Sequence, residues 1–264
     1  MTTQFLNVPQ GRLAYEVTGP ADGRLVVLAH GAGDTRRMFR FLVPSLAEAG
    51  YRVAALDVRG YGDSGTGWPD YSVQAVADDI RALIRHLGGP ALLLGHSIAV
   101  ASALWAAAEN PDDVSAVILV GGAAEKHQLK PYMRWIARRV ASSATLWLAY
   151  YSSLYPTAKP ADFAGYKRDL KASLRRKGGR DALRAQVAEA MAGPPLRYGE
   201  VHKPTLVVMG TKDPDFPDPT AEARLAVRKL ADGRLTLVEG AGHYPFAEMP
   251  DATTPAILKF LAEV

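Results

Sequence analysis

Short apolar runs alternate along most of the chain with longer stretches in which apolar residues recur every three or four positions. These short apolar runs, together with segments in which apolar and polar residues alternate, predict eight β-strands. The predicted strands are Phe5–Val8, Arg12–Val17, Leu25–Ala29, Arg52–Leu56, Ala91–Leu94, Ser115–Val120, Thr205–Met209 and Leu235–Val238. Several are apolar at every position, such as Leu92–Leu94, which is typical of strands covered on both faces.

The connections between these strands predict the fold class. Pro9-Gln10-Gly11 separates the first two strands and is typical of a hairpin turn. Most later connections have helical periodicity, and we expect helices at Phe39–Ala49, Ser72–Leu87, Ile98–Glu109, Thr220–Leu230 and Thr253–Ala262. Ser72 is expected to cap its helix, because its hydroxyl can accept from a free first-turn amide. Strands alternating with helices predict an α/β fold, with an eight-stranded, mostly parallel sheet covered by helices on both faces.

The alternation stops between Gly122 and His202. This stretch predicts helices alone, at Pro131–Val140, Ala144–Ser152, Asp162–Arg176 and Asp181–Ala192. The charge changes at the same place, because Lys126–Glu200 carries 15 Lys/Arg against 5 Asp/Glu. We therefore expect residues 123–201 to be a helical insertion in a core made of residues 1–122 and 202–264. Its basic residues either steer anionic substrates or touch a membrane surface, or they are simply solvated helix faces.

Composition excludes several kinds of chemistry. The chain has no cysteine, which rules out disulfides, thiolate catalysis and cysteine-ligated metal sites. It has no uninterrupted apolar run long enough to span a bilayer, and its N-terminus lacks the pattern of a signal peptide. We therefore expect a cytoplasmic protein without stable membrane insertion. The basic residues form no recognised nucleic-acid-binding module, so no nucleic-acid partner is expected.

One short motif places a serine where a buried strand is expected to meet a helix. In Gly95-His96-Ser97-Ile98-Ala99, the small residues two positions either side of Ser97 would allow a tight, strained turn. The helix N-terminus would add backbone amides and a partial positive charge. Serine and glycine are also common in ordinary turns, so the motif alone does not decide the question. Serine becomes a strong nucleophile only with a base, and the base is usually oriented by a carboxylate.

The candidate base is His243, one of six histidines in the chain: His30, His86, His96, His127, His202 and His243. It follows the last predicted strand, in a loop shaped by glycines before it and a proline after it. An ordinary surface histidine in a turn is the alternative. His30 and His96 adjoin buried strand ends and are expected to shape the backbone there.

The candidate carboxylate is Asp213, which follows the seventh predicted strand. Asp215 is the second choice and Asp218 the third, and an aspartate beside proline is often only a turn former. Ligand sites in open parallel sheets lie at the carboxyl ends of strands, which favours this position.

Two backbone amides are candidates for binding a developing oxyanion. The segment Leu28–Asp34 is rich in small residues and follows the third predicted strand, so its backbone could approach a substrate. The Ala32 and Ile98 amides are the expected pair. A glycine-rich turn or a phosphate loop is the alternative, but the segment lacks the Gly-Lys-Ser/Thr ending of a P-loop and the spacing of a dinucleotide fingerprint.

Taken together, these motifs resemble those of the α/β-hydrolase superfamily. The resemblance is carried by His30-Gly31, Asp57–Ser64, Gly95–Ala99, Gly210–Asp213 and Gly240–His243. It implies an α/β-hydrolase fold with a helical cap inserted after the sixth strand, and a triad in the order Ser97, Asp213, His243. Ala99 replaces the second glycine of the G-x-S-x-G motif. A serine at position 97 argues against relatives that use aspartate there, the dehalogenases and epoxide hydrolases.

The resemblance implies a serine hydrolase that cleaves an ester-like bond of a small, partly apolar molecule through an acyl-enzyme. A carboxylic ester, a thioester and a lactone fit equally well, and carbon–carbon bond cleavage stays open. A metal or organic cofactor is not expected. Two alternatives use the same scaffold: a small-molecule receptor, and a perhydrolase or non-haem haloperoxidase. The candidate substrate contacts are Trp135, Trp147 and Tyr151, which could instead pack the cap on the core.

Overall fold

The computed structural model describes residues 2–126 and 130–264. In these residues the eight predicted strands form one sheet, with the order β1-β2-β4-β3-β5-β6-β7-β8. Their bounds are β1 Gln4–Val8, β2 Gly11–Thr18, β3 Leu25–Ala29, β4 Arg52–Asp57, β5 Ala91–His96, β6 Val114–Val120, β7 Thr205–Gly210 and β8 Gly233–Val238. All neighbours from β4 to β8 are parallel, whereas β2 is antiparallel to β1 and β4. The mostly parallel sheet predicted from the sequence is confirmed.

The hairpin between β1 and β2 is tighter than the sequence predicts. Gly11 does not belong to the turn but pairs with Val8 at the start of β2. A side chain at Gly11 would lie 2.8 Å from the Trp68 ring. Glycine is thus needed here for the close packing of an indole on the strand, and not for the turn itself.

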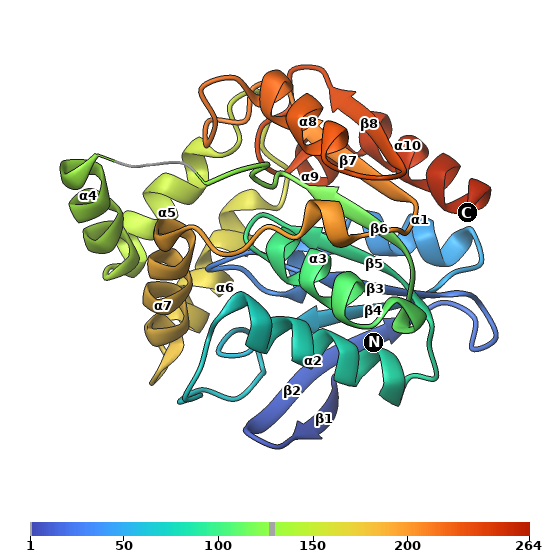
Figure 1. The fold of residues 1–264 in the computed structure, drawn as a ribbon. Helices are drawn as coiled ribbons and strands as arrows, with labels where there is room; N and C mark the ends of the chain where they lie inside the picture. The colour runs from blue at the N-terminus through green and yellow to red at the C-terminus, as the bar shows by residue number, and fades with distance from the viewer. Residues whose placement is uncertain (1, 127–129) are drawn as a thin grey trace.

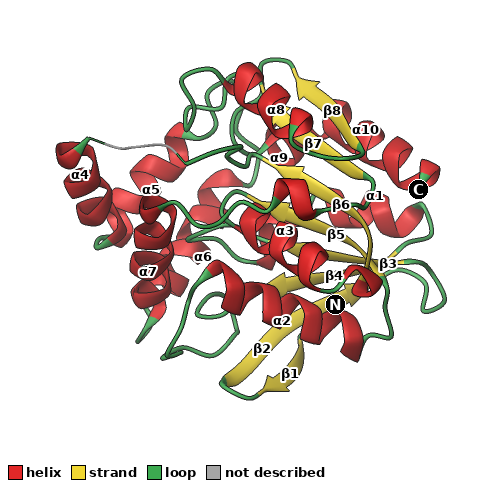
Figure 2. Cartoon of the chain, in the orientation of Figure 1, coloured by secondary structure: helices red, strands yellow, loops and turns green. Residues whose placement is uncertain are grey.

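Helices cover both faces of the sheet, as Figures 1 and 2 show. One face carries α2 (Val73–His86), α3 (Ala99–Glu109) and α8 (Pro219–Arg228). The other carries α1 (Leu42–Glu48) and α10 (Pro250–Glu263). The structure also contains four short elements: the 3-10 turns Arg36–Phe39, Pro111–Asp113 and Tyr198–Glu200, and the helix α9 (Pro245–Glu248). None of these four was predicted, because three or four residues are too short to show a helical period.

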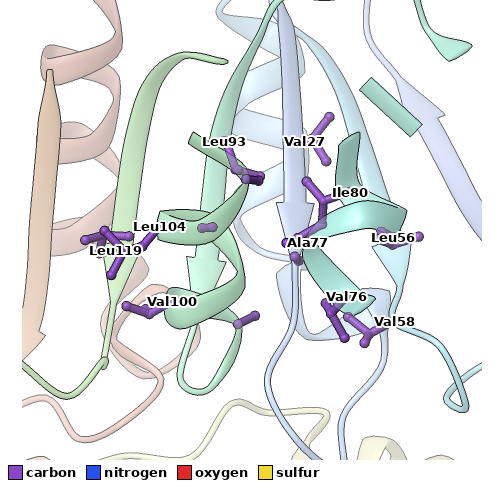
Figure 3. Close-up of a cluster of buried hydrophobic side chains, with 14 of the residues drawn as sticks. Val27, Leu56, Val58, Val76, Ala77, Ile80, Leu93, Val100, Leu104 and Leu119 are labelled. Carbon is purple, nitrogen blue, oxygen red and sulfur yellow. The ribbon is translucent and has the colours of Figure 1, made fainter. Parts of the chain in front are cut away.

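Side chains alternate along the buried strands between two apolar cores. In β5, Leu93 joins the core under α2 and α3, while Leu92 and Leu94 join the opposite core. Figure 3 shows the first core, in which α2 and α3 lay apolar side chains on the sheet, including Val76, Ile80, Val100 and Leu104. The predicted cap of α2 is confirmed, since the Ser72 hydroxyl accepts from the Ala75 amide at 3.2 Å.

A helical insertion lies between β6 and β7, where the sequence predicts it. Its helices are α4 (Pro131–Ala141), α5 (Ala144–Ser153), α6 (Phe163–Arg175) and α7 (Gly179–Ala192). Figure 1 shows them gathered at one side of the molecule, with α4 farthest from the sheet. In the described parts of the chain, no helix is both long enough and apolar enough to cross a membrane.

Candidate active site

Ser97 lies at the junction of β5 and α3, and its backbone has a left-handed conformation that residues other than glycine rarely adopt. Its φ is 56°, and elsewhere in residues 2–126 and 130–264 positive φ is confined to glycine. The Ser97 amide donates to the Val120 carbonyl at 2.9 Å, which ties the turn to β6. A side chain at Gly95 would lie 2.5 Å from the Ala99 carbonyl oxygen, so the turn closes only around small residues. Such a conformation costs about 1–3 kcal/mol and is typical of functional sites.

The loop after β3 approaches Ser97 closely. A side chain at Gly31 would lie 2.7 Å from the Ser97 Cβ, so only glycine allows this approach. Ala32, in the same loop, lines one cavity together with Ser97 and Ile98. Ile98 is the residue immediately before α3, where the partial positive charge of the helix N-terminus is concentrated.

His243 is held by Asp213. The distance from His243 Nδ1 to Asp213 Oδ2 is 2.7 Å, and both side chains are buried. The two residues come from loops after β8 and β7, which are neighbours in the sheet. The hydrogen bond that Nδ1 donates fixes the tautomer of the neutral imidazole, so its Nε2 is free to accept a proton. His243 and Ser97 line the same cavity.

The two alternative carboxylates make their hydrogen bonds with other partners. Asp215 Oδ2 is 3.7 Å from His243 Nδ1, and Asp215 Oδ1 accepts from the Tyr150 hydroxyl at 2.6 Å. The Asp218 side chain caps α8 by accepting from the Ala221 amide at 2.9 Å. Asp213 is thus the carboxylate that directly orients the imidazole.

The charges around His243 favour its protonated form. Burial opposes a charged imidazole, but the negative charges of Asp213 and Asp215 and the hydrogen bond to Asp213 outweigh it and raise the pKa of His243 to about 9. Burial raises the pKa of Asp215; the charge of His243 opposes the rise, and that of Asp213 adds to it.

These same three side chains are the group that could hold a metal ion, since their ligand atoms lie within 4.8 Å of one another. The 2.7 Å separation of the His243 and Asp213 atoms argues for a direct hydrogen bond. Two ligands of a tetrahedral ion, each ~2.0–2.1 Å from it, would be more than 3 Å apart.

His30 and His96 shape the backbone, as the sequence predicts. His30 Nδ1 donates to the Gly31 carbonyl at 2.7 Å, and its Nε2 accepts from the Val58 amide at 2.9 Å. Burial lowers the pKa of His30 to about 4 and holds that of His96 well below its usual value. His96 Nε2 donates to the His243 carbonyl at 2.9 Å, which fixes the loop that presents the imidazole. His127 lies outside the described residues.

The insertion also fixes the His243 loop. The His243 amide donates to the Leu154 carbonyl at 3.0 Å, just beyond α5. The buried Glu248 carboxylate accepts from the Gly242 amide at 2.6 Å and from the Thr157 amide at 2.7 Å. Glu248 thus joins the loop to the insertion. Sequence reasoning missed this role, because a lone glutamate near a proline has no pattern that reveals its partners.

A cavity of about 650 Å³ lies between the core and the insertion. The insertion lines it mainly with apolar side chains, among them Met133, Ile136, Val140, Trp147, Val187 and Met191. Besides the His243 imidazole, its acidic and basic lining residues are Glu125, Lys126 and Asp215. Most basic residues of the insertion therefore face elsewhere.

The three predicted substrate contacts have different places. Trp147 lines the cavity, and its indole lies against Gly33 of the loop after β3. Trp135 is 64% exposed on α4 and is absent from the cavity wall. Tyr151 is fully buried in the second core, beside Phe163. We therefore correct the sequence-based set: Trp135 and Tyr151 have no place in the cavity wall, whereas Tyr150 does.

Comparison with known proteins links this geometry to a family. The model of the alpha/beta hydrolase family matches residues 26–256. The 2-(acetamidomethylene)succinate hydrolase of Mesorhizobium japonicum is 29% identical over 95% of this chain and 92% of its own. The putative carbamate hydrolase RutD of Variovorax paradoxus is 30% identical over 96% and 97%. A bromoperoxidase structure from Bacillus anthracis superposes with a TM-score of 0.85, at 21% identity, over 99% of this chain and 100% of its own.

Proposed function

The chain belongs to the alpha/beta hydrolase family, and on that premise we propose that it hydrolyses ester-like bonds through Ser97, His243 and Asp213. One observation carries the proposal. A strained serine and an imidazole already bound to a buried aspartate line the same cavity. A nucleophile, an orienting carboxylate and a base, in this order along the chain, match the triad mechanism.

In the proposed mechanism, His243 Nε2 takes the Ser97 proton as Oγ attacks the scissile carbonyl. The Ala32 and Ile98 amides donate to the oxyanion as it forms. His243 then protonates the leaving group, and in the second half-reaction it activates the water that releases the acyl group from Ser97. Asp213 holds the imidazole in its tautomer and stabilises the imidazolium throughout.

The cavity supports a substrate class, which we include in the proposal. Its volume and mostly apolar lining fit a small, partly apolar ester, thioester or lactone. Residues 123–201 would act as a cap that closes the cavity over the core of residues 1–122 and 202–264. When His243 is neutral, as the proposed mechanism requires, two acidic residues and one basic residue line the cavity, which favours uncharged substrates over anionic ones.

The test compares Ser97→Ala with Ser102→Ala in the hydrolysis of p-nitrophenyl butyrate. Ser102 is a buried serine on α3 outside the wall of this cavity, so it is a matched control. We expect Ser97→Ala to lower kcat about 10⁴-fold or more and Ser102→Ala to keep most of the activity. Equal activity of Ser97→Ala and the wild type would refute the proposal. A single turnover that stops with Ser97 acylated would indicate a ligand receptor instead.

A further inference from the structure

Helix α4 has an outward surface that is both basic and apolar. Lys130, Arg134, Trp135, Arg138 and Arg139 are all exposed, and we call these residues the α4 face. Trp135 alone is 64% exposed. The helix packs against α5 and α7 of the insertion, and it lies at the extremity of the molecule (Figure 1). We propose that the α4 face docks on an anionic lipid surface.

No carboxylate of the residues that the structure describes forms an ion pair with the arginines of the α4 face. Residues 130–141 contain no acidic residue. Among the residues that the structure describes, Arg134, Arg138 and Arg139 have no carboxylate within ion-pair distance. Arg180 of α7 donates to the Ser142 carbonyl just beyond α4, which adds another exposed positive charge nearby. Such a cluster attracts an anionic surface at about 1 kcal/mol per Lys or Arg.

The apolar component distinguishes a lipid surface from other anionic partners. Tryptophan favours the boundary between headgroups and acyl chains, and arginine binds phosphate groups with two hydrogen bonds. Exposed apolar side chains continue around the face, namely Tyr132, Met133 and Ile136 on α4 and Leu146 on α5. A nucleic acid would offer Met133, Ile136 and Leu146 nothing to bury in. A bilayer satisfies both components, as it does for interfacial amphipathic helices.

The α4 face also adjoins the entrance to the cavity. Tyr132, Met133 and Ile136 are exposed and at the same time line the cavity that Ser97 lines. A molecule dissolved in the outer part of a lipid layer could therefore pass into the cavity along an apolar path. Lipid docking does not depend on the proposed hydrolysis. If both hold, the substrate class narrows to amphiphilic esters that partition into membranes.

The test is co-flotation of the full-length Ser97→Ala variant with vesicles, so that binding is measured apart from catalysis. The vesicles are phosphatidylcholine alone, or phosphatidylcholine with about 30% phosphatidylglycerol. We expect binding to the anionic vesicles, weakened by salt, and a blue shift of tryptophan emission that Trp135→Phe removes. Adding Arg134→Gln, Arg138→Gln and Arg139→Gln together should weaken binding at least tenfold.

A matched control removes the same charge elsewhere. Arg224, Arg228 and Lys259 are exposed on α8 and α10, and their replacement by glutamine should leave binding nearly unchanged. Both triple variants, with Ser97 restored, should hydrolyse a soluble short ester at the wild-type rate, which shows that they are folded. If both triple variants lost vesicle binding equally, the binding would depend only on the net charge of the protein, and the proposal would be overturned. Absence of binding, or a concentration-dependent dimer that shifts Trp135 emission without vesicles, would also overturn it.

Discussion

At the scale of single residues, two carboxylates act on the His243 imidazole in different ways. Asp213 accepts the Nδ1 hydrogen bond at 2.7 Å, whereas Asp215 lies at 3.7 Å and lines the cavity. Both favour the imidazolium, and so does the charge of the buried Asp34. We therefore expect Asp213 to position the base and Asp215 mainly to set the pH at which it works.

This division predicts a pH profile. His243 must be neutral to accept the Ser97 proton, and its pKa is raised to about 9, so kcat/KM should rise with pH up to about that value. Asp215→Asn should lower the pKa of His243 and move the rise to lower pH, with the rate at high pH largely retained. Asp213→Asn should instead reduce kcat about 10⁴-fold. Profiles of kcat/KM for the three proteins check this, and an Asp215→Asn profile that coincides with the wild type would contradict it.

The glycine at position 31 provides a second residue-scale prediction. A methyl group there would meet the Ser97 Cβ at 2.7 Å and the His96 Nδ1 at 3.1 Å. Gly31→Ala should displace the loop that carries Ala32, and a shift of about 1 Å can cost about 100-fold in rate. Gly199→Ala is the control, because a Cβ at Gly199 meets no atom within 4 Å. Comparable kcat values for the two variants would show that the Gly31 contact does not position the site.

The residues differ in how far the sequence could predict them. Ser97 is recognisable because its turn requires small residues at fixed spacing on either side. Asp213 precedes Asp215 by two positions, and only the folded loop shows which carboxylate reaches His243. Trp135 and Tyr151 are both aromatic residues on insertion helices. Their burial depends on how those helices pack, which their own sequences do not specify.

At the scale of elements, the sheet is predictable and the contacts between loops are not. The strands can be recognised because each contains a short run that is apolar or alternates between apolar and polar residues. The helical segments between them indicate the mostly parallel sheet. The 3-10 turns and α9 carry no periodic signal. The link between the His243 loop and the insertion depends on Glu248, which accepts from the nearby Gly242 amide and from the Thr157 and Ala158 amides, 91 and 90 residues away in sequence.

Replacing Glu248 tests whether this link stabilises the protein and positions the His243 loop. Its carboxylate accepts from the amides of Gly242, Thr157 and Ala158. Glu248→Gln offers one carbonyl oxygen in place of two carboxylate oxygens, so an NH₂ group would face at least one of these N–H donors. We expect a loss of about 1–3 kcal/mol in the free energy of unfolding and a lower kcat.

Chemical denaturation and steady-state kinetics measure both effects. The control is Glu263→Gln, whose exposed ion pair with Arg234 at 2.6 Å should be worth less than about 1 kcal/mol. Equal stability of the two variants would mean that Glu248 does not anchor the loop.

At the scale of the whole molecule, the charge of the insertion and the charge of the cavity differ. The sequence shows a basic insertion but not the direction in which its side chains point. In the structure the cavity has, besides His243, one basic lining residue, Lys126, and two acidic ones, Glu125 and Asp215. The exposed α4 face carries four of the other fourteen Lys and Arg residues in Lys126–Glu200. The sequence allows the interpretation that the basic insertion steers anionic substrates to the site. The charges that line the cavity make this interpretation less favoured than solvent-exposed or lipid-facing basic residues.

A pair of esters of similar size tests this reading. The p-nitrophenyl ester of butyrate should have a kcat/KM at least tenfold above that of the singly charged succinate ester, because the carboxylate would enter a cavity with Asp215 close to His243. Lys126→Gln should widen the difference and Asp215→Asn should narrow it. A preference for the succinate ester that Lys126→Gln abolishes would restore the steering interpretation.

The most direct test of the account is the identity of the residue that becomes covalently modified. Wild-type protein treated with a fluorophosphonate and digested should carry the added mass on the peptide that contains Ser97, and His243→Gln should slow this labelling by several orders of magnitude. Labelling of another residue, or labelling of Ser97 at the same rate without His243, would contradict the proposed active site.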